Sequence, residues 1–347
     1  MRAGQRKGVL GVVMAGGDGE RLWPVSTREE PKQFQDVLGL GETMLQAAVR
    51  RLGAFCTAEQ MVVVTSERHA ELAAQQVQGV PRNRVLGEPC KRNTAPCIAL
   101  ATAMALRTNP EAVMVVVPSD HFIADDRAFY SDVERAIAYA KCHDSLVTIG
   151  IPPRRAATEY GYIEVGDTVG DGVSEVLRFR EKPDAATAEE YLNSGKFLWN
   201  SGMFVWRVST VAAALREYMP GLLELMETLP FDAPRTEFKA AIEEVYAQVT
   251  PLSIDYGVME RAKNVAVLPG HFKWSDVGTW SALLGLLPQD AQGNALRGAV
   301  QVRDCEGVVA WVEEGCEARI EGMRGGVVTL RGGKLLVRGG ASDSATR

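Results

Sequence analysis

Three glycines, an arginine and a lysine stand close together near the start of the chain. Gly16, Gly17 and Gly19 follow an apolar run, and Arg21 and Lys32 come shortly after them. Glycines let backbone N–H groups approach phosphate oxygens closely, and the two cations neutralise charge that amides cannot. The spacing therefore predicts a loop that binds a polyphosphate.

Two common phosphate-binding motifs do not fit this loop. The dinucleotide-binding motif G-x-G-x-x-G requires a third glycine that this loop does not have. The Walker motif requires a lysine directly after its last glycine, and no lysine follows Gly19. The glycines alone equally fit an ordinary strand and turn. The full string, with residues 22–24 and 31–34 at their spacings, is far more specific.

Two aspartates far apart in the chain are candidates for holding a metal. Asp120 follows the apolar run 113–117, and Asp276 lies between Trp274 and Trp280. The carboxyl ends of parallel strands face the ligand crevice in open α/β sheets, and carboxylate oxygens suit Mg²⁺. Each aspartate alone equally fits a helix cap.

The segment from Ala15 to Phe34 resembles the signature of the sugar-nucleotide pyrophosphorylases, a nucleotidyltransferase family. The forms Leu-Trp-Pro at 22–24 and Pro-Lys-Gln-Phe at 31–34 resemble its mannose-1-phosphate guanylyltransferase branch. The resemblance covers about residues 8–290, with the motifs in family order. It departs at Ser119, where alanine is usual, and at Gly257 within the segment 253–260.

The resemblance implies Mg²⁺-dependent transfer of GMP from GTP to mannose 1-phosphate, by a single in-line displacement that releases pyrophosphate. Asp120 and Asp276 would then be the two metal ligands. Arg21 and Lys32 would neutralise the leaving pyrophosphate, and Lys182 would orient the attacking phosphate. The remaining implied contacts are Ala15, Gly16, Gly17, Gly19, Glu88, Asn93 and Thr94 to the nucleotide, and Gly161, Glu181 and Asn200 to the sugar.

Structural explanations compete for several of these positions. Asn93 or Thr94 equally fits a helix cap, and neighbouring Glu181 and Lys182 are commonly just solvated charge. A nucleotidyltransferase that uses another hexose 1-phosphate or another nucleoside triphosphate is an alternative function with the same chemistry. A non-catalytic, nucleotide-sugar-binding subunit is less favoured, because it would be expected to lose a metal carboxylate or a phosphate lysine.

The reaction needs neither a general base nor a covalent nucleophile. A phosphomonoester's second pKa is about 6, so a sugar 1-phosphate is largely a dianion at neutral pH and can attack directly. No G-x-S-x-G motif occurs, and His69, His121, His143 and His271 form no metal or triad pattern. Positioning and charge neutralisation would supply the catalysis.

The composition of the chain argues against several classes of binding partner. The chain has 347 residues, a net charge of −6 and six cysteines without a C-x-x-C pair. These features argue against nucleic acid and a zinc site, and no apolar run approaches the ~20 residues of a membrane span. We expect a cytoplasmic protein, and the sequence leaves a homodimer open.

Alternating strand and helix patterns predict an α/β fold with a mainly parallel sheet flanked by helices. The family resemblance implies that this sheet is mixed and Rossmann-like, of the glycosyltransferase-A-like kind. We expect a catalytic domain at 1–290, with a nucleotide part at about 8–150 and a sugar-phosphate part at about 151–290. We expect a small β region at 291–338, by resemblance a short left-handed β-helix, and a disordered tail at 339–347. Relatives often carry a phosphomannose isomerase domain, an activity not expected of this chain.

Overall fold

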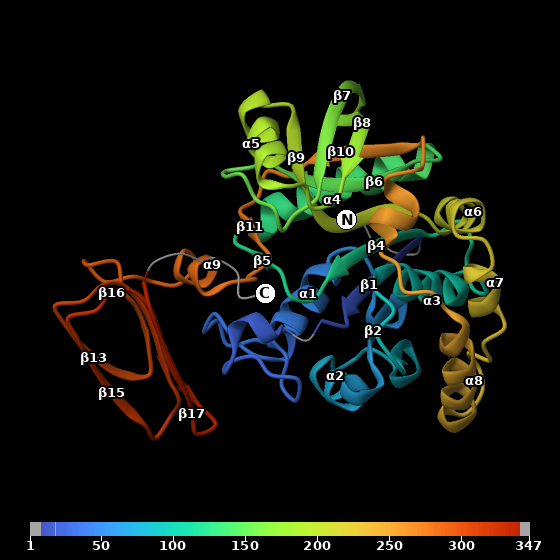
Figure 1. Ribbon diagram of the computed structural model, residues 1–347. Coiled ribbons are helices and arrows are strands. Elements are labelled where there is room, and N and C mark those ends of the chain that lie inside the picture. Colours follow the sequence, from blue (N-terminus) through green and yellow to red (C-terminus); the bar gives the residue numbers. More distant parts are fainter. Residues whose placement is uncertain (1–7, 18, 341–347) are drawn as a thin grey trace. The chain divides into compact units, whose positions relative to one another are not determined.

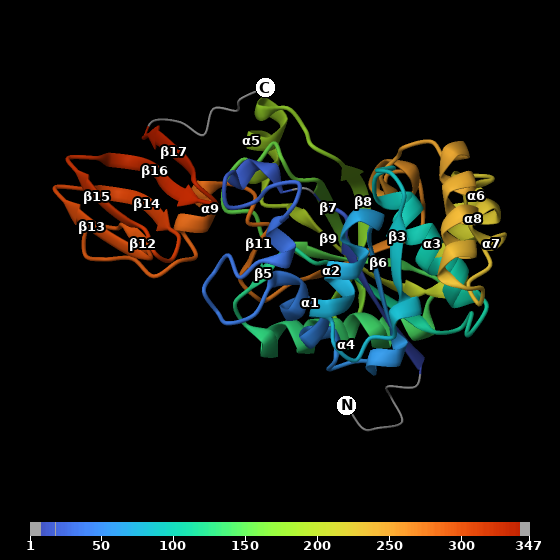
Figure 2. The ribbon, with the colours of Figure 1, turned by 90° about the horizontal axis from the view of Figure 1, so that it is seen from below.

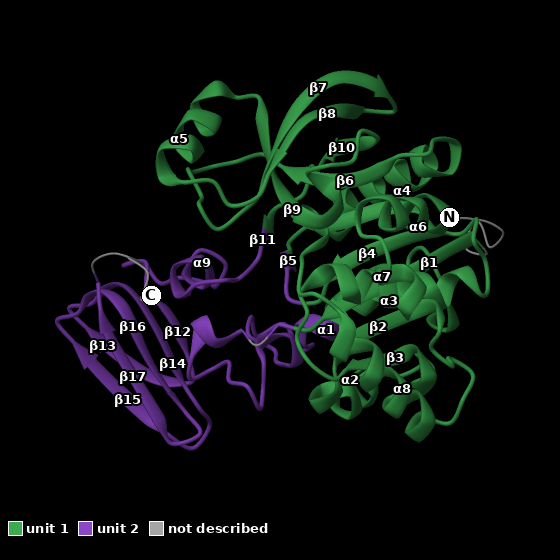
Figure 3. Cartoon of the chain, turned by 45° about the vertical axis from the view of Figure 1, so that its right-hand side comes forward, with its two compact units in different colours: residues 1–16, 46–119, 123–274 green, residues 17–45, 120–122, 275–347 purple. Residues whose placement is uncertain are grey.

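The computed structural model describes residues 8–17 and 19–340. The chain forms two compact units, which Figure 3 shows in different colours. Unit 1 comprises Met1–Gly16, Gln46–Ser119 and Ile123–Trp274, and unit 2 comprises Gly17–Leu45, Asp120–Phe122 and Ser275–Arg347. The predicted domain boundary at residue 290 stays a prediction. The two units are defined by compactness, and they group residues 17–45 with the C-terminal strands.

A nine-stranded sheet forms the centre of unit 1 among the described residues, in the order β3-β2-β1-β4-β9-β6-β10-β8-β7 (Figure 1). The pairs β3–β2, β2–β1, β1–β4 and β6–β10 are parallel, whereas β9 and β8 run antiparallel to their neighbours. The strands are β1 (Val9–Ala15), β2 (Met61–Ser66), β3 (Val85–Glu88), β4 (Val113–Pro118), β6 (Leu146–Ile151), β7 (Tyr162–Gly170), β8 (Val173–Arg180), β9 (Phe197–Arg207) and β10 (Val265–Pro269).

Helices cover both faces of this sheet. Leu10 and Val12 belong to the core cluster that contains α3, whereas a side chain on the intervening Gly11 would meet Leu52 and Cys56 on the other face. Figure 2 shows α6, α7 and α8 beside α3. The helices are α1 (Met44–Leu52), α2 (Ala70–Gln76), α3 (Thr94–Leu106), α4 (Asp126–Cys142), α5 (Ala185–Ser194), α6 (Val208–Tyr218), α7 (Leu222–Glu227) and α8 (Arg235–Gln248).

Unit 2 joins an N-terminal loop to C-terminal strands through one apolar core. Leu22, Val25 and Val37 from the loop pack in a cluster with Trp280 and Trp311. Its elements are α9 (Trp280–Leu284), β12 (Ala295–Arg297), β13 (Ala299–Arg303), β14 (Glu306–Val312), β15 (Glu317–Glu321), β16 (Arg324–Arg331) and β17 (Lys334–Gly339). There are two further short strands, β5 (Phe122–Ile123) and β11 (Trp274–Ser275). In each of them, one residue belongs to unit 1 and the other to unit 2.

The C-terminal strands alternate between two small parallel sheets. Strands β12, β14 and β16 pair in one, and β13 and β15 in the other, while β17 returns antiparallel on β16. This alternation is that of a short β-solenoid. The predicted fold class is confirmed, and the handedness of the coil remains a prediction.

Two local predictions need correction. The sequence pattern predicts a helix over residues 277–287, but α9 is shorter, because Thr279 caps it and it begins at Trp280. Asn93 and Thr94 both fit a cap of α3, and the structure shows Asn93 in that place. Gly339, expected in a disordered tail, ends strand β17, and residues 341–347 lie outside the described part. Among the described residues, no helix has the length and apolar character that crossing a membrane requires.

Candidate active site

The ammonium group of Lys32 contacts the carboxylate of one predicted metal ligand, Asp120, and the backbone of the other, Asp276, within unit 2. Lys32 Nζ lies 3.0 Å from Asp120 Oδ2. It also donates to the backbone carbonyls of Asp276, at 2.5 Å, and Val277, at 3.2 Å. The lysine is 5% exposed, so these contacts hold it where little water screens its charge. Three segments far apart in sequence therefore meet at one cation.

The turn after Asp276 is strained in a way that serves this contact. Val277 has φ 47, a conformation that is a genuine outlier for a β-branched residue, and its side chain is fully buried. Such strain persists only where the surroundings impose it, and it clusters at functional sites. Here the turn presents two successive carbonyls to Lys32.

Arg21 belongs to the same cluster. A Cβ placed on Gly278 would lie 2.6 Å from Asp276 Oδ2 and 3.3 Å from Arg21 Nη2. Both side chains thus lie against the bare backbone of Gly278. Arg21 is exposed, so its guanidinium can meet a ligand from solvent. The predicted pair of cations, Arg21 and Lys32, is brought together with both aspartates.

The glycine loop owes its shape to close contacts. Gly19 has φ 62, and a Cβ there would lie 2.5 Å from Ser26 Oγ and 3.0 Å from Lys32 Cγ. Ser26 Oγ accepts from the Lys32 N–H at 2.9 Å, and Gln33 Nε2 donates to the Gly17 carbonyl at 2.6 Å. Only glycine at 19 permits this packing, which fixes the backbone that carries Lys32.

The helix-cap explanations of the aspartates fail. Asp125, not Asp120, caps α4 by accepting from the Arg127 and Ala128 N–H groups. Thr279 caps α9, so Asp276 is not needed there. Asp276 Oδ1 instead accepts locally from the Gly278 N–H, at 3.2 Å. Both carboxylates remain candidates for chemistry.

The donor set fits Mg²⁺. Burial opposes ionisation of Asp120, but the nearby charges of Lys32 and His121 outweigh it and hold the pKa of this carboxyl below its ordinary value. An ionised carboxylate is the hard oxygen ligand that Mg²⁺ prefers. Within residues 8–17 and 19–340, no three or more His, Cys, Asp or Glu side chains gather as a metal site. Two carboxylates completed by substrate phosphates and water are a typical Mg²⁺ arrangement.

Glu88 stands at the carboxyl end of β3 in unit 1, where the loop begins. Its side chain is 8% exposed, and Oε1 accepts from the Tyr246 hydroxyl at 2.9 Å. A Cβ on Gly16 would lie 3.5 Å from Glu88 Oε2, so the carboxylate lies beside the glycine backbone. Burial raises the pKa of Glu88 to about 7, against the opposing Tyr246 hydrogen bond. Next to Gly16, Ala15 is buried, and its carbonyl accepts from Thr65 Oγ1 at 2.8 Å.

Asn93 and Thr94 use their side chains within the protein. Asn93, at φ 70, accepts from the Thr94 N–H at 2.9 Å and caps α3. Thr94 Oγ1 accepts from the Ile254 N–H at 2.9 Å. These bonds tie the loop after β3 to the segment that contains Asp255. Contacts of Asn93 and Thr94 to a nucleotide remain a prediction.

Glu181 and Lys182 form a charged pair at the end of β8. Lys182 Nζ lies 2.8 Å from Glu181 Oε1, and Lys182 has the uncommon φ of 46. Partial burial opposes the charge of Lys182, yet the Glu181 carboxylate raises its pKa above the ordinary value. Glu181 Oε2 is buried and has no hydrogen-bond partner within the described residues. A buried carboxylate oxygen without a donor is costly, and a sugar hydroxyl would satisfy it.

Gly161 makes room for this carboxylate. A Cβ at position 161 would collide with Glu181 Oε2. The Gly161 carbonyl accepts from the Asn200 N–H at 2.8 Å. The structure therefore brings Gly161, Glu181, Lys182 and Asn200 together in unit 1, and their contacts to a sugar phosphate remain a prediction.

Asp255 is a buried carboxylate that sequence reasoning did not select. Asn200 Nδ2 donates to Asp255 Oδ1 at 2.8 Å, and Thr148 and Gly202 donate to Asn200 Oδ1. Burial and the neighbouring Glu181 charge raise the pKa of Asp255 to about 7. Asp255 also begins a π-helical segment, Asp255–Met259, a rare conformation that often occurs at functional sites.

Tyr246 is the other residue that the sequence did not reveal. It lies on α8, 158 positions from the Glu88 to which it donates. Nothing in the pattern of α8 distinguishes this tyrosine from an ordinary core aromatic. For Asp255, the surrounding motif at 253–260 was a signal, but the partners that bury it come from other segments.

Arg21, Lys32, Asp120 and Asp276 gather in unit 2, and cations and carboxylates of this kind suit a phosphorylated ligand and a divalent metal. A family model described as Nucleotidyl transferase matches residues 10–293. The chain therefore belongs to the nucleotidyl transferase family.

Individual relatives agree with this assignment. The Xanthan biosynthesis protein XanB of Xanthomonas campestris pv. campestris (strain ATCC 33913) is 42% identical over 306 residues, which cover 87% of this chain and 64% of XanB. The mannose-1-phosphate guanylyltransferase RfbM of Salmonella typhimurium (strain LT2) is 40% identical over 301 residues, covering 85% of this chain and 62% of RfbM. The chain thus spans less than two thirds of the length of these curated relatives.

A solved structure covers nearly the whole chain. It is described as mannose-1-phosphate geranyltransferase from Thermus thermophilus, with a TM-score of 0.85 and 35% identity. The alignment covers 96% of this chain and 95% of that one. The likeness therefore includes the C-terminal strands as well as the large sheet.

Proposed function

We propose that this chain is a mannose-1-phosphate guanylyltransferase, which transfers GMP from GTP to mannose 1-phosphate and releases pyrophosphate. Relatives of that name, at about 40% identity, support the choice of substrates. The observation that carries the chemistry is the contact of Lys32 with Asp120 and with the turn at Asp276.

The roles follow from the charges. The triphosphate lies along Gly16, Gly17 and Gly19, and Arg21 and Lys32 neutralise the pyrophosphate as it leaves. Removal of one such charge-stabilising group typically slows a reaction by about 10²–10³. Members of this family generally use a divalent metal. Mg²⁺ held by Asp120 and Asp276 would supply further positive charge where the phosphates react.

The attacking phosphate needs orientation and no base. Lys182 binds it, and Glu181 Oε2 accepts from a sugar hydroxyl, which satisfies the unpaired oxygen described above. Asn200 and Asp255 hold the shape of this part, and Gly161 leaves the space. An already ionised sugar phosphate then attacks the α-phosphorus of GTP in line, in a single displacement.

Glu88 reads the base in this proposal. A carboxylate accepts from both the N1–H and the 2-amino group of guanine, which adenine lacks as donors in that arrangement. Tyr246 fixes the carboxylate on one side. Asn93 and Thr94, at the start of α3, complete the contacts to base and ribose.

Pyrophosphate release tests the proposal. The purified protein is incubated with Mg²⁺, each of GTP, ATP, CTP and UTP, and mannose, glucose or galactose 1-phosphate. We expect release only, or at least tenfold fastest, with GTP and mannose 1-phosphate. Fastest release with another pair would support the alternative of a different nucleotidyltransferase. No release with any pair, from protein that binds GTP, would support a regulatory subunit.

Location and assembly are further proposals. We place the protein in the cytoplasm, with GTP and mannose 1-phosphate as its small-molecule partners and neither nucleic acid nor membrane among them. The sequence leaves a homodimer open, and sedimentation of the full chain would distinguish it from a monomer.

A further inference from the structure

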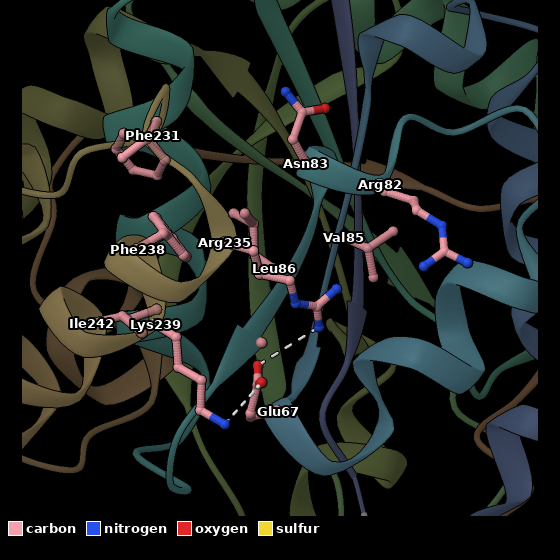
Figure 4. Close-up of a pocket in the computed structure, with 12 residues that line it drawn as sticks. Glu67, Arg82, Asn83, Val85, Leu86, Phe231, Arg235, Phe238, Lys239 and Ile242 are labelled. Atoms are coloured by element: carbon pink, nitrogen blue, oxygen red, sulfur yellow. Dashed lines mark ion pairs between the residues drawn. The ribbon is translucent and has the colours of Figure 1, made fainter.

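A cavity of about 340 Å³ lies in unit 1 between edge strand β3 and helix α8 (Figure 4). Its apolar walls are formed by Val85 and Leu86 on the strand side and by Phe231, Phe238 and Ile242 on the other. Small-molecule sites of about 300–1,000 Å³ commonly have apolar walls and a few converging polar groups. The cavity has the size and walls for one aromatic ring system.

The mouth of the cavity carries surplus positive charge. Lys239 Nζ lies 3.3 Å from a Glu67 carboxylate oxygen, and an Arg235 nitrogen lies 4.0 Å from the other oxygen. Figure 4 shows these two α8 side chains converging on Glu67. Two carboxylates, Glu67 and Glu71, interact with the three cations Arg82, Arg235 and Lys239, so one positive charge is in excess, and both α8 cations are about half exposed. Arg82, a third cation at the cavity, pairs outward with Glu71 at 2.9 Å.

The same two walls lead directly to the proposed base-reading carboxylate. Strand β3 ends at Glu88, one residue beyond the cavity, and α8 carries Tyr246 one turn beyond Ile242. The Tyr246 hydroxyl bonds Glu88 at 2.9 Å and so joins the two walls at their far end. Glu67 packs so closely on Gly87 that a Cβ there would collide with it. A molecule between β3 and α8 therefore restrains the elements that position Glu88.

We propose that this cavity binds a small aromatic anion, whose ring lies on the apolar walls and whose charge meets Arg235 and Lys239. Its binding makes GTP bind more tightly, because it holds β3 and α8 in the arrangement that positions Glu88. Two ligands that favour the same arrangement of the same elements bind cooperatively without any large movement. This second half rests on the proposed role of Glu88 in reading guanine.

Direct binding tests the first half. The probe is 1-anilinonaphthalene-8-sulfonate, and N-phenyl-1-naphthylamine, with the same rings and no charge, is its matched control. We expect one sulfonate probe per chain, bound at least tenfold more tightly than the neutral amine. Lys239→Glu should weaken the sulfonate at least tenfold and leave the amine unchanged. Lys263→Glu, an exposed lysine outside the cavity, should change neither. Equal effects of the two variants would overturn the site.

Reciprocal titrations test the second half. GTP should bind at least threefold more tightly with saturating probe, and GTP should tighten the probe by the same factor. Both effects should vanish in Lys239→Glu. Probe binding that leaves GTP affinity unchanged would overturn the coupling and retain the site. A chain that binds the probe but no GTP would instead refute the proposed function, and with it the coupling.

Discussion

At the scale of single residues, the proposed function makes Glu88 the link between burial and the choice of base. Its pKa is raised to about 7, and guanine needs the ionised form. Tyr246 donates to this carboxyl, and the thiol of Cys97 lies close enough to feel its charge. Preference for GTP over ATP should therefore rise with pH through about 7 and level off above it.

The ratio of the dissociation constants of ATP and GTP, measured from pH 5.5 to 8.5, isolates this effect, because both nucleotides titrate alike at their phosphates. Glu88→Gln should make the ratio flat and near one. A ratio that still rises through pH 7 in that variant would show that another group reads the base.

Lys182 is the residue we expect to separate the two substrates. It is half exposed at the end of β8 and holds Glu181. Lys182→Ala should raise the KM for mannose 1-phosphate at least tenfold, with little change in GTP affinity. Steady-state kinetics with each substrate varied would check this. Lys196→Ala, another exposed lysine of unit 1, is the control. A defect confined to GTP would contradict the assignment.

Asp255 should make stability fall as pH rises. Its pKa in the folded protein is about 7 and its ordinary value is 3.8, so the folded state binds more protons between these values. Its contribution is fully favourable below pH 4 and is lost as pH rises through 7. Asp255→Asn keeps an acceptor for Asn200 and removes the charge.

The melting temperature of Asp255→Asn should therefore exceed that of the wild type by several degrees at pH 8 and by little at pH 4.5. Thermal unfolding at both values is the measurement. If Asp255→Asn lowered the melting temperature equally at both pH values, the ionised carboxylate of Asp255 would be stabilised by its surroundings, and the prediction would be wrong.

At the scale of elements, the C-terminal strands hold the loop that carries Arg21 and Lys32. The Arg297 guanidinium lies 4.0 Å from the Trp311 ring centroid, and Arg297 Nη1 donates to the Asp36 carbonyl at 2.7 Å. A partly buried cation–π contact and a charged hydrogen bond together contribute about 1–3 kcal/mol. The loop at 17–45 is thereby fixed from the far end of the chain.

Arg297→Ala should slow pyrophosphate release at least fivefold and lower the melting temperature by a few degrees. Arg303→Ala removes an arginine of the neighbouring strand that pairs only at the surface with Glu321, so it should leave both nearly unchanged. Equal rates for the two variants would show that the strands do not position the loop.

Elements with strong apolar patterns were predictable from sequence, and those shaped by tertiary contact were not. The residue patterns predict strands at 9–15 and 173–180 and a helix at 208–218, and β1, β8 and α6 have these bounds. Strand β3 is four residues long and contains a glycine, so its period is too short to detect. Helix α9 begins later than its sequence pattern predicts, because the carbonyls of residues 276 and 277 accept hydrogen bonds from Lys32 in a strained turn.

The same distinction holds in the candidate site. The cations and aspartates at 21, 32, 120 and 276 belong to recognisable motifs, and the structure brings them together. Asp255 and Tyr246 were missed because their importance arises from partners elsewhere in the chain. Long-range hydrogen bonds of this kind leave no local pattern.

At the scale of the whole molecule, each compact unit carries its own part of the proposed chemistry. Unit 2 contains the cluster of Arg21, Lys32, Asp120 and Asp276, and unit 1 contains the residues proposed for base and sugar. The chain has a net charge of −6, so binding of the proposed anionic substrates would depend on these local cations. The central claim is that the four side chains of unit 2 act together on the phosphates.

Pyrophosphate release by Asp120→Asn, Asp276→Asn and the double variant, at saturating Mg²⁺, tests that claim most directly. Asp304→Asn, on the surface of the same unit, is the control. Groups that act as a unit are strongly non-additive. We predict that each single change slows release by about 10²–10³ and that the double variant is scarcely slower than either. Losses that multiply in the double variant, or a single variant at the wild-type rate, would contradict it.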